Sequence, residues 1–214
     1  MVKTRVATTG SDRDAEHRII AAAHAVFVRR GTAGARMQEI ADEAGVNKAL
    51  LHYYFRNKRR LADAVFQRAI QRLFERVAEV LGSDEPLEAK VETLIGLYLD
   101  QLSKAPFLPG YVLAELNQHP ERATQFAASM RARRVAMLAT LNRQLKARIR
   151  AGTLRRIPTR QFIVNLVSLC IFPFAARPMI CAVLNLDADG FVRFIEERKK
   201  VLPEFFLAAL RPPQ

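Results

Sequence analysis

The sequence predicts an all-α protein with a small N-terminal head and a larger helical body. Apolar residues recur at intervals of three and four along most of the chain, which is the period of helices with one buried face. No segment shows the apolar–polar alternation of a half-buried β-strand. A chain of 214 residues that is 50% hydrophobic is long enough to bury a core in each part.

The charge of the chain indicates a polyanionic partner. The chain carries 34 lysines and arginines against 21 acidic residues, a net charge of +13. Residues 1–60 hold 12 of these cations and 6 of the acids, so the N-terminal part is the more basic part per residue.

The first helix is predicted over about residues 12–30, followed by a turn at residues 32–35. Ser11 or Asp12 can cap its N-terminus, and the acidic residues of its first turn lie at the positive end of the helix dipole. Its predicted inner face consists of Ile19, Ala23, Val26 and Phe27.

Two short helices joined by a tight turn are predicted over residues 36–55. In the first helix, apolar residues fall on one face at helical spacing: Met37, Ile40, Ala41 and Ala44. Gly45 is predicted to end this helix in the left-handed conformation, and Asn47 to cap the next. In the second helix Leu51 and Phe55 face inward, which leaves the residues around them largely outward. This layout is typical of a helix-turn-helix, whose second helix lies in the major groove of DNA.

The string IADEAGVNKALLHYYFRNKRRL, preceded by RIIAAAHAVFVRRG, resembles the N-terminal head of TetR-family transcriptional regulators. The resemblance covers about residues 13–75, and beyond them the chain is similar to the family only in being helical and of suitable length. It implies a DNA-binding head, and a body that dimerises through its last two helices and holds a small effector in a cavity. The matching residues are Arg18, Ile19, Ala22, Ala23, Phe27, Gly31, Ile40, Ala41, Ala44, Gly45, Val46, Leu51, Tyr54, Phe55, Lys58 and Leu61.

The outward face of the second short helix holds groups suited to DNA. Lys48 suits a guanine or a phosphate, and the hydroxyls of Tyr53 and Tyr54 suit phosphates. Leu50 either presses against a thymine methyl or belongs to the local core, and the aromatic pair has packing as its alternative. The resemblance implies phosphate contacts for Tyr54 and Lys58, and a base-edge or a backbone contact for Tyr53. The predicted DNA-binding residues are Arg36, Met37, Gln38, Asn47, Lys48, Ala49, Leu50, His52, Tyr53, Tyr54 and Lys58.

The head departs from the family pattern at three places, one of which is Leu50, where the family often carries a small or hydroxyl residue. A serine or threonine usually begins the first short helix, whereas this chain has Arg36 after Ala35, and an arginine can reach a phosphate itself. His52 replaces the more usual tyrosine and can still donate to a phosphate. Residues 1–12 are predicted to form a flexible basic arm, either a plain tail or a contact to the DNA backbone or minor groove.

A long helix is predicted over residues 58–81, because its apolar side chains keep a steady four-residue spacing. The basic triplet at its N-terminus, residues 58–60, is unfavourable for the helix dipole and is expected to meet a phosphate backbone. The segment GSDEP, residues 82–86, is the predicted boundary between the head, residues 13–75, and the ligand-binding and dimerisation body, residues 83–214.

Five helices are predicted in the body, at about residues 87–103, 109–118, 121–150, 159–181 and 188–209. The fourth is apolar on nearly all sides and the fifth has an apolar face, so we expect the two to form a dimeric four-helix interface. Pro173 and Pro203 are expected to kink these helices. Residues 122–160 contain 11 basic residues and no acid, which indicates a solvated face, an acidic effector or a second nucleic-acid contact.

Candidates for the effector cavity come from apolar, aromatic and cationic side chains of the body. Arg134 shares a helical stripe with Met130 and Met137 and can meet an acidic group of a ligand. Alternatively, the side chain of Arg134 extends into solvent instead of binding a ligand. The aromatic residues can likewise be packed in the core instead of lining a cavity. No cofactor is expected and the effector is unknown. The predicted ligand-binding residues are Phe107, Tyr111, Met130, Arg134, Met137, Phe172, Phe174 and Arg177.

The sequence lacks the signatures of several other classes of protein. The N-terminus lacks the apolar core of a signal peptide, and no apolar stretch reaches the roughly 20 residues that span a bilayer. Glycine-rich phosphate loops, nucleophile elbows and paired-histidine metal motifs are absent, so an enzyme or a metal site is not expected. Cys170 and Cys181 have no histidine nearby and are expected to be reduced, as in a cytoplasmic protein.

The sequence therefore predicts a cytoplasmic, dimeric repressor that leaves a palindromic DNA operator when a small molecule binds its body. A ligand-dependent activator on the same fold and a basic, non-specific nucleic-acid-binding protein are the alternatives. A small ratio of specific to non-specific affinity would support the last of these.

Overall fold

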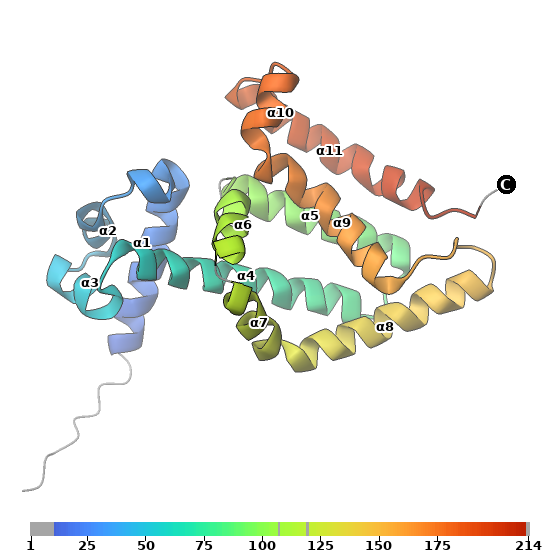
Figure 1. Ribbon diagram of the computed structural model, residues 1–214, viewed down its shortest axis with the longest axis horizontal. Helices are drawn as coiled ribbons and strands as arrows, with labels where there is room; N and C mark the ends of the chain where they lie inside the picture. Colours follow the sequence, from blue (N-terminus) through green and yellow to red (C-terminus); the bar gives the residue numbers. More distant parts are fainter. Residues whose placement is uncertain (1–10, 107, 119, 213–214) are drawn as a thin grey trace, which may run out of the picture. The chain divides into compact units, whose positions relative to one another are not determined.

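The computed structural model describes residues 11–106, 108–118 and 120–212. Within these ranges the chain forms helices α1–α11 and no β-strand, which confirms the all-α prediction (Figure 1). The chain divides into two compact units, Met1–Ile70 and Gln71–Gln214. We call the first unit the head and the second the body.

The head consists of α1 (Ser11–Gly34), α2 (Met37–Ala44), α3 (Lys48–Phe55) and the first part of α4 (Lys58–Gly82). Gly31 interrupts α1 with a φ of 66° and a ψ of 165°, a conformation that only glycine adopts without strain. The buried side chains of the head include Ile19, Ala23, Val26, Phe27, Ile40, Ala41, Ala44, Leu51, Phe55, Leu61, Val65 and Phe66.

The division between head and body falls inside α4 and not at the predicted linker, residues 82–86. The last turns of α4 belong to the body because Val77, Ala78 and Leu81 are buried in its hydrophobic core. The predicted head, residues 13–75, therefore extends five residues too far along α4. Polar turn residues indicate where a helix ends, but the division depends on which core the helix packs against.

The body contains seven further helices in the described ranges: α5 (Leu87–Lys104), α6 (Leu108–Gln118), α7 (Pro120–Ser129), α8 (Arg131–Arg150), α9 (Thr159–Ala175), α10 (Arg177–Val183) and α11 (Ala188–Ala208). Helix α5 packs against both α9 and α11, and α9 also packs against α8 (Figure 1). The most deeply buried apolar side chains of the body are Val91, Leu94, Ile95, Leu99, Leu141, Leu145, Phe162, Cys170 and Ile195.

Two predicted helices of the body are each broken in two. The helix expected over residues 121–150 ends at Ser129 and resumes at Arg131, because Met130 leaves helical geometry with a φ of −97° and a ψ of 11°. The Ser129 hydroxyl donates to the Phe126 carbonyl at 2.8 Å, a local bond of the kind that competes with helical geometry.

The helix expected over residues 159–181 bends by 74° between α9 and α10. Ala176 leaves helical geometry at the bend, with a φ of −104° and a ψ of 23°. Pro178 explains why one helix does not run on through this point, since it lacks an N–H group and its ring clashes with the carbonyl one turn earlier, whereas the first turn of a new helix tolerates it. Helix α9 continues through Pro173 and α11 continues through Pro203, so neither of these prolines ends its helix.

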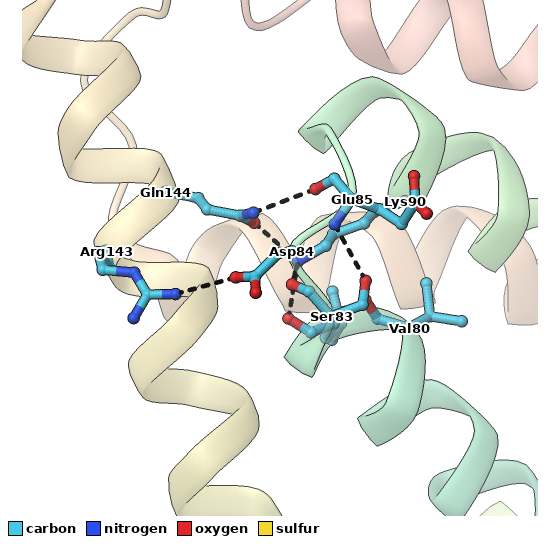
Figure 2. A network of polar contacts seen from close by, with 8 residues as sticks. Val80, Ser83, Asp84, Glu85, Lys90, Arg143 and Gln144 are labelled. Atoms are coloured by element: carbon cyan, nitrogen blue, oxygen red, sulfur yellow. Dashed lines mark hydrogen bonds and ion pairs between the residues drawn. The ribbon is translucent and has the colours of Figure 1, made fainter.

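A buried lysine joins the C-terminal end of α4 to α5 and α8 (Figure 2). Lys90 is 1% exposed, and its Nζ donates to the Leu81 carbonyl at 3.0 Å and the Ser83 carbonyl at 2.6 Å. Its third bond goes to Oε1 of Gln144 on α8 at 2.7 Å. The last carbonyls of a helix lack helical donors and carry partial negative charge, so a cation is favoured there. Burial lowers the pKa of Lys90, but only the ammonium form can serve all three acceptors.

A second polar contact joins α9 to α11. Pro173 has no N–H group, so the carbonyl of Leu169 one turn earlier loses its helical donor. Arg198 of α11 replaces that donor, with Nε at 3.2 Å and Nη2 at 2.8 Å from the Leu169 oxygen. The guanidinium therefore satisfies a carbonyl that the proline leaves open.

We predict that Arg198→Met destabilises the protein by about 1.5–3 kcal/mol, the usual worth of a hydrogen bond to a charged group. In a Pro173→Ala background the alanine N–H can bond to Leu169, so the same arginine substitution should cost less than half as much. Urea unfolding of the four proteins measures this double-mutant cycle. Equal losses in both backgrounds would contradict this account of Arg198.

Candidate nucleic-acid interface

The turn between α2 and α3 is set by Gly45. This residue has a φ of 63° and a ψ of 37°, the left-handed conformation predicted for the helix end. The Gly45 N–H donates to the Asp42 carbonyl at 3.1 Å, and the Val46 N–H to the Ala41 carbonyl at 3.0 Å. These bonds close the end of α2 and redirect the chain towards α3.

The start of α3 is capped as its sequence predicts. Asn47 has extended backbone angles, and its Oδ1 accepts a hydrogen bond from the Leu50 N–H at 2.7 Å. Leu51 is fully buried and Phe55 is 6% exposed, which confirms the inward face of the helix. Helix α3 is thus fixed at its start by a cap and along one side by two apolar anchors.

The outward face of α3 combines a cation with exposed aromatic groups. Lys48 and Ala49 are exposed, and the side chain of Tyr53 is 75% exposed. The rings of Tyr53 and Tyr54 meet edge to face with centroids 5.4 Å apart. Leu50 is half-buried, so both of its predicted roles fit its position. A tyrosine this exposed on an anchored helix leaves its hydroxyl free to bind a partner.

His52 fastens the C-terminal end of α3. Its Nδ1 lies 3.1 Å from the Arg56 carbonyl, and the Arg56 N–H donates back to the His52 carbonyl at 2.9 Å. The first contact requires the hydrogen to be on Nδ1, which leaves Nε2 as an acceptor. Neutral His52 in this tautomer therefore cannot also donate to a phosphate through Nε2.

Lys58 lies at the start of α4 and braces the head internally. Its Nζ donates to the carbonyls of Ala33 at 2.9 Å and Ala35 at 3.1 Å, which lie at the turn between α1 and α2. Asn57 caps α4, since its Oδ1 accepts from the Arg60 N–H at 2.9 Å. Two of the three ammonium hydrogens are thus used inside the head, which leaves one for the phosphate contact that the family resemblance implies.

The remaining predicted contacts lie on or beside α2. Arg36 precedes α2 with extended backbone angles and makes no side-chain cap, and its exposed side chain has no partner among the described residues. Met37 is half-buried. The amide of Gln38 donates to Asp42 Oδ1 at 2.8 Å and is therefore partly engaged.

Ion pairs between α1 and α2 neutralise acidic groups near this surface. Arg29 pairs with Glu43 at 2.8 Å, and Arg30 pairs with Glu39 at 2.8 Å. The hydrogen bond from Arg29 lowers the pKa of Glu43. The two glutamates of α2 thus face arginines of α1, while Lys48 and Arg36 have no acidic partner among the described residues. Sequence spacing gave no sign of these pairs, because their members belong to different helices.

The predicted effector-binding residues differ in burial. Met137 and Phe174 are buried in the hydrophobic core of the body, whereas the side chain of Phe172 is 53% exposed. The Arg177 guanidinium lies 4.7 Å from the ring centroid of Phe191, which also packs edge to face on Phe174. Met130 is half-buried at the break between α7 and α8, and Arg134 is exposed. Phe107 and the side chain of Tyr111 lie outside the described residues.

The described residues hold no group of three or more histidine, cysteine or acidic side chains placed to bind a metal ion. Cys170 is buried and Cys181 half-buried, and both are free. In the same residues no single helix is long and apolar enough to cross a membrane; only α9 and α10 together, bent by 74°, have the length and composition.

The head is similar to known bacterial regulatory proteins. Residues 19–65 match the model of the bacterial regulatory proteins of the tetR family. The transcriptional activator FasR of Mycolicibacterium smegmatis is 35% identical over 82 residues, which are 38% of this chain and 37% of FasR. The transcriptional repressor SCO4008 of Streptomyces coelicolor is 32% identical over 119 residues, 54% of this chain and 60% of that protein. The chain thus matches less than two thirds of the length of either relative.

Solved structures share the fold along nearly the whole chain. A TetR-family transcriptional regulator from Mesorhizobium loti superposes with a TM-score of 0.61 at 19% identity, covering 98% of this chain and 100% of its own. A TetR/AcrR-family regulator from Thermobifida fusca gives a TM-score of 0.63 at 18% identity, covering 89% and 97%. At these identities the likeness establishes the fold of head and body.

We predict that Lys58→Met lowers the stability of the head by about 1–3 kcal/mol, because two carbonyls lose their donor. The exposed neighbour Arg60 is the matched control, and Arg60→Met should change stability by no more than about 0.5 kcal/mol. Thermal unfolding without DNA measures both variants. Equal effects would mean that the bonds of Lys58 to the turn between α1 and α2 contribute nothing.

Proposed function

We propose that the chain is a sequence-specific, DNA-binding transcriptional regulator of the TetR family. The observation that carries the proposal is the geometry of α3. This helix is capped by Asn47, anchored by Leu51 and Phe55, and turns Lys48 and Tyr53 outward. A short helix held in this way presents its side chains at a fixed angle, as reading base edges in the major groove requires.

We propose that the protein acts as a dimer through α9, α10 and α11. Large apolar side chains are exposed on these three helices, although a lone soluble chain seldom exposes many together. Two heads related by a twofold axis would bind a palindromic operator with half-sites about one helical turn, roughly 10 base pairs, or a multiple apart. The exposed residues are Val164, Phe172, Met179, Val183, Val192, Val201 and Phe205.

We further propose that the protein is a repressor whose body binds a small molecule that releases the DNA. The ligand must bind the DNA-free arrangement more tightly than the DNA-bound one, since only unequal binding shifts the population. A ligand-dependent activator is the second candidate, and the relatives include both an activator and a repressor. Binding to chromosomal DNA would place the protein in the cytoplasm.

Fluorescence anisotropy at near-physiological salt tests the proposed activity. The two probes are a duplex from the protein's own upstream region and a shuffled duplex of equal length and composition. We expect the upstream duplex to bind at least about a hundredfold more tightly, within the range of specific over non-specific binding. Equal affinity for this duplex and for other promoter duplexes would support a non-specific nucleic-acid-binding protein instead.

Two substitutions on α3 should separate positioning contacts from base contacts. Tyr53→Phe removes only a hydroxyl assigned to a phosphate, so we expect similarly weaker binding to every duplex. Leu50→Ala removes an apolar contact to a thymine methyl, so we expect a changed preference at one base pair, worth about 1–3 kcal/mol. Binding to a panel of single-base operator variants measures both effects. If Leu50→Ala weakened binding to all duplexes alike, the result would support the alternative role of Leu50 as part of the local core.

A further inference from the structure

One end of the body gathers cations that the proposed function does not use. Residues 123–160 contain no acidic residue. Three of their arginines pair with acids of neighbouring segments: Arg133 with Glu75 at 2.6 Å, Arg143 with Asp84 at 3.3 Å and Arg148 with Glu88 at 2.6 Å. Five further cations between residues 146 and 160 have no such acidic partner among the described residues. They are Lys146, Arg150, Arg155, Arg156 and Arg160, and all are exposed.

Hydrogen bonds bring these cations to one end of the body, together with Arg211 after α11. The Arg155 N–H donates to the Leu210 carbonyl at 2.9 Å, which ties the segment between α8 and α9 to the end of α11 (Figure 1). The Thr159 hydroxyl lies 3.0 Å from Asn142 Oδ1, which ties the start of α9 to α8. We call this surface the basic end: Lys146, Arg150, Arg155, Arg156, Arg160 and Arg211.

The charge of the basic end is not neutralised within the described residues. Glu88, the carboxylate that the structure places beside this end of α8, is bonded by both Nη atoms of Arg148. Arg160 lies in the first turn of α9, where a cation is unfavourable for the helix dipole. An external anion would offset both the mutual repulsion of the cations and this unfavourable position.

The chemistry of the basic end favours a phosphodiester backbone over the other polyanions. Five of its six cations are arginines, which bind phosphate through two parallel hydrogen bonds. The apolar residues of the connecting segment do not project outward, since Leu154 is buried and Ile157 packs on the hydrophobic core. A membrane-surface helix or a protein interface needs exposed apolar anchors. Binding through cations alone is the usual way to hold a nucleic-acid backbone.

We propose that the basic end is a second nucleic-acid surface, which holds the backbone of double-stranded DNA without regard to sequence. It is separate from α3 and belongs to the body. Its existence does not depend on the operator preference proposed for the head, because it acts on any duplex. For a protein bound to an operator, it would add affinity for DNA outside the operator.

The full-length variant Arg150→Gln/Arg156→Gln tests this surface. The matched control Lys104→Gln/Arg131→Gln removes the same charge from exposed positions near the opposite ends of α5 and α8. Lys104 lies 16 residues from Glu88 along α5, about 24 Å by the helical rise. The probe is a fluorescein-labelled duplex of shuffled sequence, and its binding constant is measured across a range of salt concentrations.

We expect the Arg150/Arg156 variant to flatten the slope of log K against log salt by about 2, since each lost phosphate contact removes about 0.9. Between about 50 and about 200 mM salt, the wild type should then lose about tenfold more affinity than this variant. The control should keep the wild-type slope. Equal flattening in both variants would show a general effect of net charge, and no flattening would show a solvated face; either result overturns the proposal.

Two further measurements separate the alternatives. The first is binding to phosphatidylserine vesicles. If the wild type bound them and the Arg150/Arg156 variant did not, while the salt slope for DNA was unchanged, the surface would be assigned to a membrane and the proposal overturned. The ratio of affinities for the upstream and shuffled duplexes reports on the head alone. A ratio near one with a flattened slope in the Arg150/Arg156 variant would reject the operator preference and support the basic end.

Discussion

Helix α4 is the element on which both parts of the molecule depend, and a lysine secures each of its ends. At its start, Lys58 donates to the Ala33 and Ala35 carbonyls of the head. Beyond its end, Lys90 donates to the Leu81 and Ser83 carbonyls within the body. In both places an ammonium group satisfies carbonyls for which regular secondary structure supplies no donor. Head and body divide within this one continuous helix, so α4 links the two units along the chain.

The head shows how a short helix can be made to hold its side chains outward. Gly45 sets the turn, Asn47 caps the helix, and Leu51 and Phe55 anchor it, so few of its residues are free to vary in position. An isolated helix of eight residues would not be stable in water, and tertiary anchoring replaces the missing length. The exposed Tyr53 and Lys48 are thereby preorganised for a partner, which reduces the entropy lost on binding.

The sequence predicted the structure best where a feature depends only on residues that are close together along the chain. The glycine end of α2 and the asparagine cap of α3 follow local rules, and both were predicted correctly. The brace formed by Lys58 joins residues more than 20 positions apart, and no spacing rule indicates it. The break between α9 and α10 near Pro178 was not predicted, because the kink was expected at Pro173. The carbonyl that Pro173 leaves without a donor is bonded instead by Arg198 of another helix. The effector site stays a prediction, because Met137 is buried in the hydrophobic core of the body and an apolar stripe does not distinguish the lining of a cavity from a core.

The central claim is that α3 reads DNA sequence in a symmetric pair of heads. Selection of bound duplexes from a random pool by the full-length protein, followed by sequencing, tests this most directly. The account predicts a palindromic consensus whose half-sites lie about one helical turn, or a multiple of it, apart. The same selection with Leu50→Ala should return a consensus changed at equivalent positions in both half-sites. A pool that stays random after repeated selection, while the protein still retains DNA, would contradict the claim.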